Sequence, residues 1–204
     1  MKLRCFLPQD MAAVALGADE VAVALLTEAA RRGLEVILTR TGTRGLFWLE
    51  PLLEVATPDG RIGYGPVSPG DIPGLLDAIV EDRGHPLSLG MVEAIPFLKR
   101  QTRLTFARAG IIDPLSIDDY RTHGGLRGVE QALALGPARI VETVTASGLR
   151  GRGGAGFPTG LKWHTTSEAP GAQKYIVCNA DEGDSGTYAD RMVMEGDPFM
   201  LIEG

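Results

Sequence analysis

The sequence predicts an α/β protein in two parts, a compact N-terminal module and a second α/β segment that follows a linker. Three observations lead to this prediction. Strand-like and helix-like patterns alternate over residues 1–82. Glycine and proline punctuate residues 83–115, which is typical of a connecting segment. From residue 116 onward, helical patterns lead into a stretch with five glycines in ten residues, at 151–160.

The N-terminal module has the patterns of four strands and two helices. Apolar and β-branched runs predict the strands, at residues 2–7, 34–40, 52–57 and 61–64. Apolar positions at helical spacing predict the helices, at residues 18–32 and 71–80. Gly33 suits the position just after the first helix, and Pro58-Asp59-Gly60 suits a turn between the last two strands.

Beyond the module, the helix signals are punctuation residues. The linker is expected to run over a surface with one or two short helices. Ser116-Ile-Asp-Asp119 has the form of a capping box and predicts a helix start. Pro137 suits the first position of a further helix through Ser147, and Gly148 suits its end. A strand is predicted at residues 174–178.

Composition excludes several classes of function. The chain is 44% hydrophobic and 23% charged, as soluble globular proteins are. Its net charge of -6 gives no support for nucleic-acid binding, and no apolar run reaches the roughly 18 residues of a membrane helix. Without an evident signal peptide, the cytoplasm is the simplest location.

Cysteine and histidine give no metal site. Cys5 and Cys178 are too few for a disulfide framework, or for an iron–sulfur cluster held by cysteines alone. Cys178 is expected to be a small buried hydrophobe. The three histidines lack metal-ligand spacing, so no metal-ligating residue is predicted.

The glycine-rich stretch is the first candidate for a binding site. Gly151, Gly153 and Gly156 satisfy G-x-G-x-x-G, but a helix precedes them and no acidic residue follows at the distance that a Rossmann fold requires. Residues without side chains still let backbone N–H groups approach a planar ring or a diphosphate. Phe157 suits stacking on a base and Lys162 suits a phosphate. A mobile surface loop is the alternative, and the residues alone leave both open.

A polar group at the end of the predicted strand is the second candidate. Asn179, Asp181, Glu182 and Asp184 offer the amide and carboxylate groups that a flavin or nicotinamide site needs. A solvated acidic turn is the plain alternative. A Mg²⁺ or Ca²⁺ site ranks third, because nothing else resembles a calcium-binding loop.

Taken together, the two motifs resemble one family. GLRGRGGAGFPTGLKW (148–163) followed by CNADEGDSGTYADR (178–191) resembles the flavin- and NADH-binding subunit of respiratory complex I. Its relatives include the diaphorase subunits of NAD-reducing hydrogenases and of NAD-dependent molybdenum formate dehydrogenases. Residues 112–120, with Gly124-Gly125 after them, are similar to the start of the same flavin domain.

The first 80 residues resemble a thioredoxin-like [2Fe–2S] ferredoxin domain. In that domain a T-G-C-x-G-x-C segment carries two cluster cysteines, and here Thr43 and Phe47 occupy their places. The resemblance therefore implies a thioredoxin-like module at 1–82 without a cluster, a linker at 83–115, and at 116–204 the N-terminal part of a truncated FMN/NAD(H)-binding domain. A cluster-free module ahead of the flavin domain is the arrangement of the formate dehydrogenase β subunit.

The family's chemistry is hydride transfer between NAD(H) and FMN, followed by single-electron exchange between FMN and iron–sulfur clusters. The resemblance implies an iron–sulfur γ-type subunit and a molybdenum-containing α subunit as partners, and NAD⁺ reduction with electrons from formate. A [4Fe–4S] cluster is expected in the missing C-terminal part. The alternatives are a diaphorase of a hydrogenase or complex I-like enzyme, and a non-catalytic assembly fragment.

Matching positions assign roles to individual residues. The residues expected to contact FMN are Gly151, Gly153, Lys162, Asn179 and Asp181, with Arg152, Gly154, Gly156 and Gly160 completing the cofactor loop. Phe157 is expected to stack on the adenine of NAD(H). Asp184, where complex I relatives carry glutamate, and Glu182 are the candidate catalytic residues beside the nicotinamide end.

Overall fold

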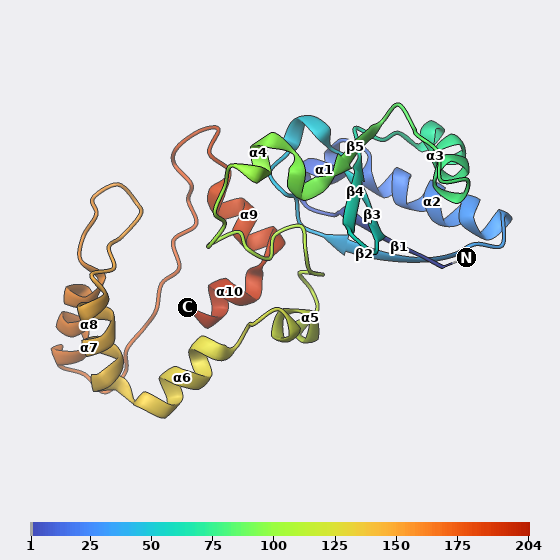
Figure 1. Cartoon of the computed structure of the whole chain (residues 1–204). Helices are drawn as coiled ribbons and strands as arrows, with labels where there is room; N and C mark the ends of the chain where they lie inside the picture. The colour runs from blue at the N-terminus through green and yellow to red at the C-terminus, as the bar shows by residue number, and fades with distance from the viewer. Residues whose placement is uncertain (1) are drawn as a thin grey trace. The chain divides into compact units, whose positions relative to one another are not determined.

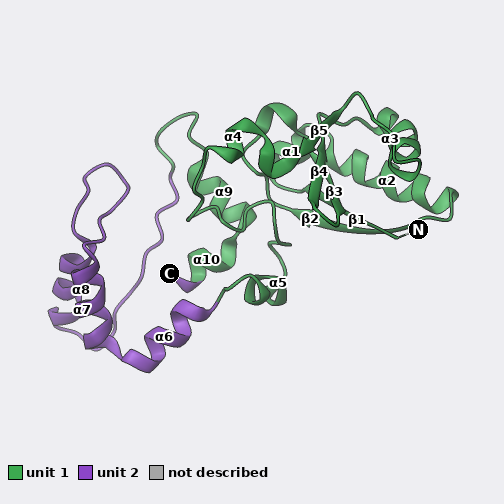
Figure 2. Cartoon of the chain, viewed as in Figure 1, with its two compact units in different colours: residues 1–125, 182–202 green, residues 126–181, 203–204 purple. Residues whose placement is uncertain are grey.

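The computed structural model describes residues 2–204, which divide into two compact units. Unit 1 runs up to Gly125 and includes Glu182–Ile202, whereas unit 2 comprises Leu126–Asp181 and the last two residues (Figure 2). The predicted domain boundaries at 82 and 115 do not coincide with this division. The module, the linker and the flavin-domain segment that they separate stay a prediction.

Unit 1 is built on one five-stranded sheet of order β2-β1-β3-β4-β5 (Figure 1). Its strands are β1 (Lys2–Pro8), β2 (Glu35–Thr41), β3 (Leu53–Thr57), β4 (Gly60–Tyr64) and β5 (Ser88–Met91). Strands β1 and β2 are parallel, with Lys2 opposite Glu35, and the other neighbours are antiparallel. The two parallel strands are joined by a helical crossover, as parallel pairing requires.

The helices of the module are α1 (Met11–Ala15), α2 (Ala18–Arg31) and α3 (Ile72–Val80), with 3-10 turns at Phe47–Leu49 and Pro69–Asp71. Helix α2 turns its apolar face to the sheet, where Val21 and Leu25 are fully buried. Leu7 of β1 and Leu75 of α3 belong to the same core. The predicted strands and helices α2 and α3 form in the predicted order, whereas α1 was not predicted. The α/β fold class is confirmed.

The segment expected to be a linker contributes to the fold. Its strand β5 pairs with β4, and it continues into a 3-10 turn at Val92–Ala94 and helix α4 (Pro96–Lys99). Val92 and Leu98 are buried in a second apolar cluster with Leu46 and Leu52. The strand was missed because a four-residue run containing a glycine has no strand signal of its own; its partner β4 supplies the hydrogen bonds.

The later helices are α5 (Ile117–Thr122), α6 (Arg127–Leu135), α7 (Pro137–Ser147), α8 (Thr159–Glu168), α9 (Ala189–Gly196) and α10 (Pro198–Glu203). Ser116 caps α5 through a 3.1 Å hydrogen bond from the N–H of Asp119, as the capping box predicts. Helix α7 starts at Pro137 and ends at Ser147, and Gly148, whose φ is +68°, caps it. Both predicted helix ends are therefore confirmed.

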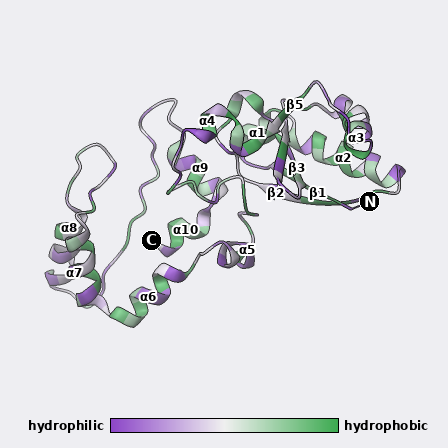
Figure 3. Ribbon diagram, viewed as in Figure 1, coloured by the Kyte–Doolittle hydropathy of each residue, from purple (hydrophilic) through white to green (hydrophobic). Residues whose placement is uncertain are grey.

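Hydrophobic and hydrophilic residues alternate along the helices (Figure 3). Within residues 2–204, no helix has the length and apolar character needed to cross a membrane.

Candidate functional site

The glycine-rich segment forms a loop that is pinned at its base. The N–H of Gly151 donates to the carbonyl of Phe157 at 2.9 Å, and the N–H of Thr159 donates to the carbonyl of Leu149, also at 2.9 Å. These bonds close the loop between α7 and α8. The first turn of α8 therefore follows the loop directly, so its N–H groups and the positive end of its dipole lie next to the glycines.

The glycines inside the loop leave a bare face of backbone. A Cβ added to Gly153 or Gly154 would meet no atom within 4 Å. Gly154 and Gly156 have φ values of +105° and +59°, which residues with side chains rarely adopt. Open backbone of this kind lets a flat ring or a phosphate approach the peptide N–H groups, which is what the sequence predicts for a cofactor loop.

Two arginine side chains donate hydrogen bonds to backbone carbonyls of this loop. Arg150 donates to the carbonyl of Gly156 at 2.7 Å, across the loop. Arg152 donates to the carbonyl of Arg150 at 2.7 Å, so its guanidinium folds back on the loop. Arg152 is among the residues that the sequence predicts for the site, whereas Arg150 was missed. The two arginines look alike in the motif, and only the fold shows which of them bridges the loop.

Gly160 has a packing role that the sequence did not reveal. A Cβ at Gly160 would lie 2.5 Å from Cα of Thr145, so only glycine lets α8 approach α7 this closely. Gly160 is the only buried residue of α8. Its place in the motif is thus explained by helix packing, and a cofactor contact is not needed to account for it.

Phe157 lies just before α8 and Lys162 lies at the end of its first turn, and both side chains are exposed. Phe157 is 53% exposed. No hydrogen bond or ion pair to the Lys162 ammonium is found in residues 2–204. Both side chains are therefore available to a ligand.

The predicted strand at 174–178 does not form, and this prediction is wrong. Tyr175, Ile176 and Val177 are 82%, 99% and 87% exposed. Strands need a hydrogen-bonded neighbour, and the described part of the chain offers this segment none. For the same reason Cys178 is exposed, which overturns the prediction that it is buried.

The polar group that follows is divided between the two units. Asn179 accepts the N–H of Asp181 at 2.9 Å, an Asx turn within unit 2. Glu182 and Asp184 belong to unit 1. Both oxygens of Glu182 accept N–H groups at the start of α9, from Asp190 at 3.1 Å and Arg191 at 3.3 Å. The exposed carboxylate of Asp184 makes no hydrogen bond or ion pair among the described residues.

Thr43 and Phe47, the residues expected from the sequence at the two cysteine positions, each have a partner within unit 1. The Thr43 hydroxyl donates to Glu50 at 2.6 Å, and the Phe47 ring packs edge-on against Tyr188 at 5.8 Å. Burial raises the pKa of Glu50 to about 7 and that of Cys5 to about 12. Cys5 is therefore a protonated core residue.

Comparisons with known proteins match the segment that contains the glycine loop and the polar group that follows it. Residues 144–204 match the family model of the Nuo51 FMN-binding domain. The chain is 51% identical over 105 residues to the NADP-reducing hydrogenase subunit HndC of Solidesulfovibrio fructosivorans, covering 52% of this chain and 21% of that protein. It is 46% identical over 113 residues to an NADH-quinone oxidoreductase subunit of Aquifex aeolicus, covering 54% and 26%.

A third relative is the NAD-reducing hydrogenase HoxS subunit alpha of Cupriavidus necator, 46% identical over 86 residues, with 42% of this chain and 14% of that protein covered. The chain thus spans about a quarter or less of the length of these relatives.

Solved structures give similarities at lower identity. The thioredoxin-like [2Fe-2S] ferredoxin from Aquifex aeolicus is 16% identical with a TM-score of 0.39, over 46% of this chain and 96% of that one. An NAD⁺-reducing [NiFe]-hydrogenase is 22% identical with a TM-score of 0.38, over 98% and 33%. The C-terminal segment is thus similar to the Nuo51 FMN-binding domain, and the similar proteins include NADH-quinone oxidoreductase and NAD-reducing hydrogenase subunits.

Proposed function

We propose that this chain is part of a diaphorase subunit that transfers hydride between NAD(H) and FMN. The observation that carries the proposal is the glycine loop, which is closed at its base and presents bare backbone directly ahead of α8. Its segment matches a family model named for FMN binding. A helix start behind a glycine loop is a ready site for the phosphate of a flavin nucleotide.

The residues of unit 2 fit such a cofactor. Backbone N–H groups around Gly153 and Gly154 would face the ring or the phosphate, and Lys162 would add a charged hydrogen bond. The Asn179–Asp181 turn offers an amide and a carboxylate to polar edges of the flavin, and Phe157 offers an exposed ring for the adenine of NAD(H). Bound FMN would supply the redox chemistry.

The acidic residues have unequal roles in this proposal. Glu182 is engaged as the cap of α9, so we assign it to positioning. We assign the Asp184 carboxylate to a contact with the ribose or nicotinamide end of NAD(H). Its side chain is one methylene shorter than the glutamate of complex I relatives, and the contact therefore requires a closer approach of the backbone.

The electron source is the finer part of the proposal. A module without cluster cysteines ahead of a flavin domain favours the formate dehydrogenase arrangement, with an iron–sulfur subunit and a molybdenum subunit as partners and a [4Fe–4S] cluster elsewhere in the β subunit. A hydrogenase diaphorase is the second candidate, favoured by the 51% identity to a hydrogenase subunit. Metal analysis of the complex purified from its host separates them: we expect molybdenum, and nickel would favour the hydrogenase.

Lys162→Ala tests the assignment of the flavin site. A charged hydrogen bond contributes about 1.5–3 kcal/mol, so FMN affinity in the purified complex should fall by roughly one to two powers of ten. Lys99→Ala, which removes an equal charge from the exposed surface of unit 1, is the matched control and should bind FMN normally. FMN titration followed by flavin fluorescence measures both. Equal affinities in the two variants would show that Lys162 does not contact the flavin.

A further inference from the structure

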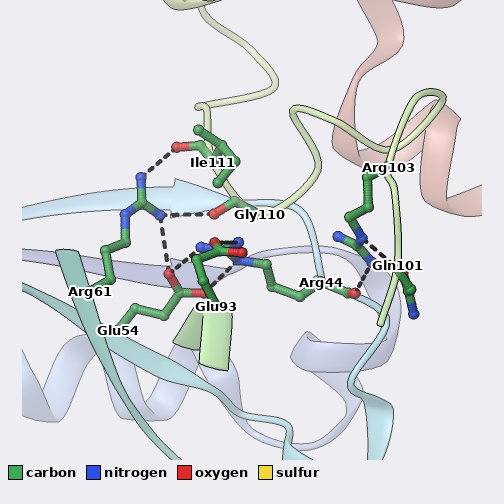
Figure 4. A network of polar contacts seen from close by, with 8 residues as sticks. All are labelled: Arg44, Glu54, Arg61, Glu93, Gln101, Arg103, Gly110 and Ile111. Carbon is green, nitrogen blue, oxygen red and sulfur yellow. Dashed lines mark hydrogen bonds and ion pairs between the residues drawn. The ribbon is translucent and has the colours of Figure 1, made fainter. Parts of the chain in front are cut away.

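The loop Thr41–Phe47, here called the socket loop, is fixed by hydrogen bonds and ion pairs of charged side chains around Arg44 (Figure 4). Arg44 donates two hydrogen bonds of 2.8 Å to Glu54, and both side chains are 3% exposed. Glu93 accepts a further bond from Arg44 at 2.6 Å, and Arg103 donates to the Arg44 carbonyl at 2.5 Å. Separating desolvated charges is costly, so this loop keeps its shape.

Thr43 is fixed as well. Besides its bond to Glu50, its hydroxyl accepts the N–H of Gly45 at 3.0 Å. Glu50 accepts the N–H of Leu52 at 2.9 Å. Thr43, at one of the two predicted cysteine positions, is thus part of a hydrogen-bond network.

Helix α9 covers this loop. Tyr188, just ahead of α9, makes the edge-on ring contact with Phe47. A Cβ added to Gly45 would lie 3.1 Å from the terminal methyl of Met192. Apolar groups of the helix segment therefore lie against both the middle and the end of the socket loop.

The far end of α9 is packed still more closely. A Cβ added to Gly42 would lie 2.5 Å from Cα of Gly196, so two glycines let the backbones touch. Glu195 accepts the N–H of Met11 at 2.6 Å, which joins α9 to the start of α1.

Little space remains between the helix and the loop. The cavity there measures about 10 Å³, and its lining includes Thr43 and Phe47 of the loop and Tyr188, Met192 and Glu195 of the helix segment. That is room for about one water molecule. The side of the socket loop that carries Thr43 and Phe47 is therefore occupied by a helix.

The same helix holds the acidic loop that precedes it. Glu182 caps α9, so the loop 182–188 is tied to the helix at both ends. Its end residues Glu182 and Tyr188 have φ values of +28° and +55°. Such conformations are unfavourable in residues with side chains, and they persist only where their surroundings enforce them.

We propose that the socket loop is a docking surface for α9, used in place of cluster binding, and that this docking fixes the acidic loop 182–188. A consequence for NAD(H) rests on the proposed function. Asp184 lies inside the fixed loop, so undocking of α9 weakens NAD(H) binding while FMN stays bound.

Gly42→Ala is the direct test, because the three atoms nearest to its new Cβ belong to Gly196 and its φ is one that alanine tolerates. Amide hydrogen exchange in residues 182–196 should accelerate by about tenfold or more, with exchange in β1–β4 unchanged. Gly84→Ala, where an added Cβ meets nothing within 4 Å, is the control. Phe47→Ser provides a second disruption from the opposite end of the socket loop. Unchanged exchange at 182–196 in both disrupting variants overturns the proposal.

The consequence for NAD(H) is tested in the purified complex. For Gly42→Ala we expect a KM for NADH raised about three- to tenfold at an unchanged FMN content. Faster exchange with an unaltered KM overturns the link between docking and nucleotide binding. If even the unmodified complex neither binds FMN nor oxidises NADH, the proposed function fails, and the exchange data decide the docking by themselves.

Discussion

At the scale of single residues, Glu50 is a buried acid whose pKa lies well above its ordinary value. It is 4% exposed, and desolvation raises its pKa to about 7 although Thr43 and the N–H of Leu52 favour its charged form. Asp10 and Glu54 add negative charge nearby. The folded protein therefore holds a proton at Glu50 that the unfolded chain releases. This carboxyl contributes stability that is present below about pH 4 and lost as pH rises through about 7.

Glu50→Gln should remove most of this pH dependence. A shift from 4.5 to about 7 corresponds to about 3.5 kcal/mol at most, since each pKa unit is about 1.4 kcal/mol. Urea unfolding at about pH 5 and about pH 8 gives the difference in stability for each protein. Glu20→Gln, at an exposed position of α2, is the control and should behave as the unmodified chain does. A pH dependence that survives in Glu50→Gln would place the responsible group elsewhere; Asp10, whose pKa is raised by burial, is then the next residue to change.

At the scale of elements, local patterns predict the structure wherever the stabilising partner is also local. Helix α2, the β3–β4 hairpin and both ends of α7 follow from apolar spacing, a turn sequence and capping residues. Local patterns do not predict strand β5, nor the absence of a strand at 174–178, because strand pairing depends on a neighbour that is distant in sequence.

The candidate site, too, could be predicted from the sequence only where it depends on local residues. The bare backbone of the glycine loop follows from the residue types themselves. The loop-bridging Arg150, the helix-packing Gly160 and the capping Glu182 depend on contacts six to fifteen residues away, which no motif encodes.

Gly160→Ala tests the packing of α7 against α8. The new Cβ would be forced against the backbone of Thr145, so the two helices must separate, at a cost of about 1–3 kcal/mol. Gly153→Ala adds the same methyl group where nothing lies within 4 Å and is the matched control. Hydrogen exchange in residues 137–168 should rise by about tenfold or more only in Gly160→Ala. Equal exchange in the two variants would mean that the close approach of the helices does not govern their stability.

At the scale of the whole molecule, the two units differ in how much apolar surface they bury. Unit 1 has two apolar clusters and the buried ion pair of Arg44 and Glu54. In unit 2, α6 and α7 contain no buried residue, and α8 contains only Gly160. Unit 2 has a long-range polar contact: Glu203 accepts the N–H groups of Leu126 and Gly128 at 2.7 and 2.8 Å. Local stability follows buried apolar contacts, so unit 2 should open far more often than unit 1.

We therefore expect amides of residues 126–181 to exchange at least about a hundredfold faster than those of β1–β4 in the isolated 204-residue chain. FMN in excess should slow exchange selectively at residues 150–162, because a ligand that binds only the ordered loop stabilises it by RT ln(1 + [L]/Kd). At a hundred times its Kd this amounts to about 2.7 kcal/mol. Lys162→Ala in the same experiment should require more FMN for equal protection. Protection spread evenly over both units would indicate non-specific binding, and protection confined to unit 1 would place the flavin away from the glycine loop.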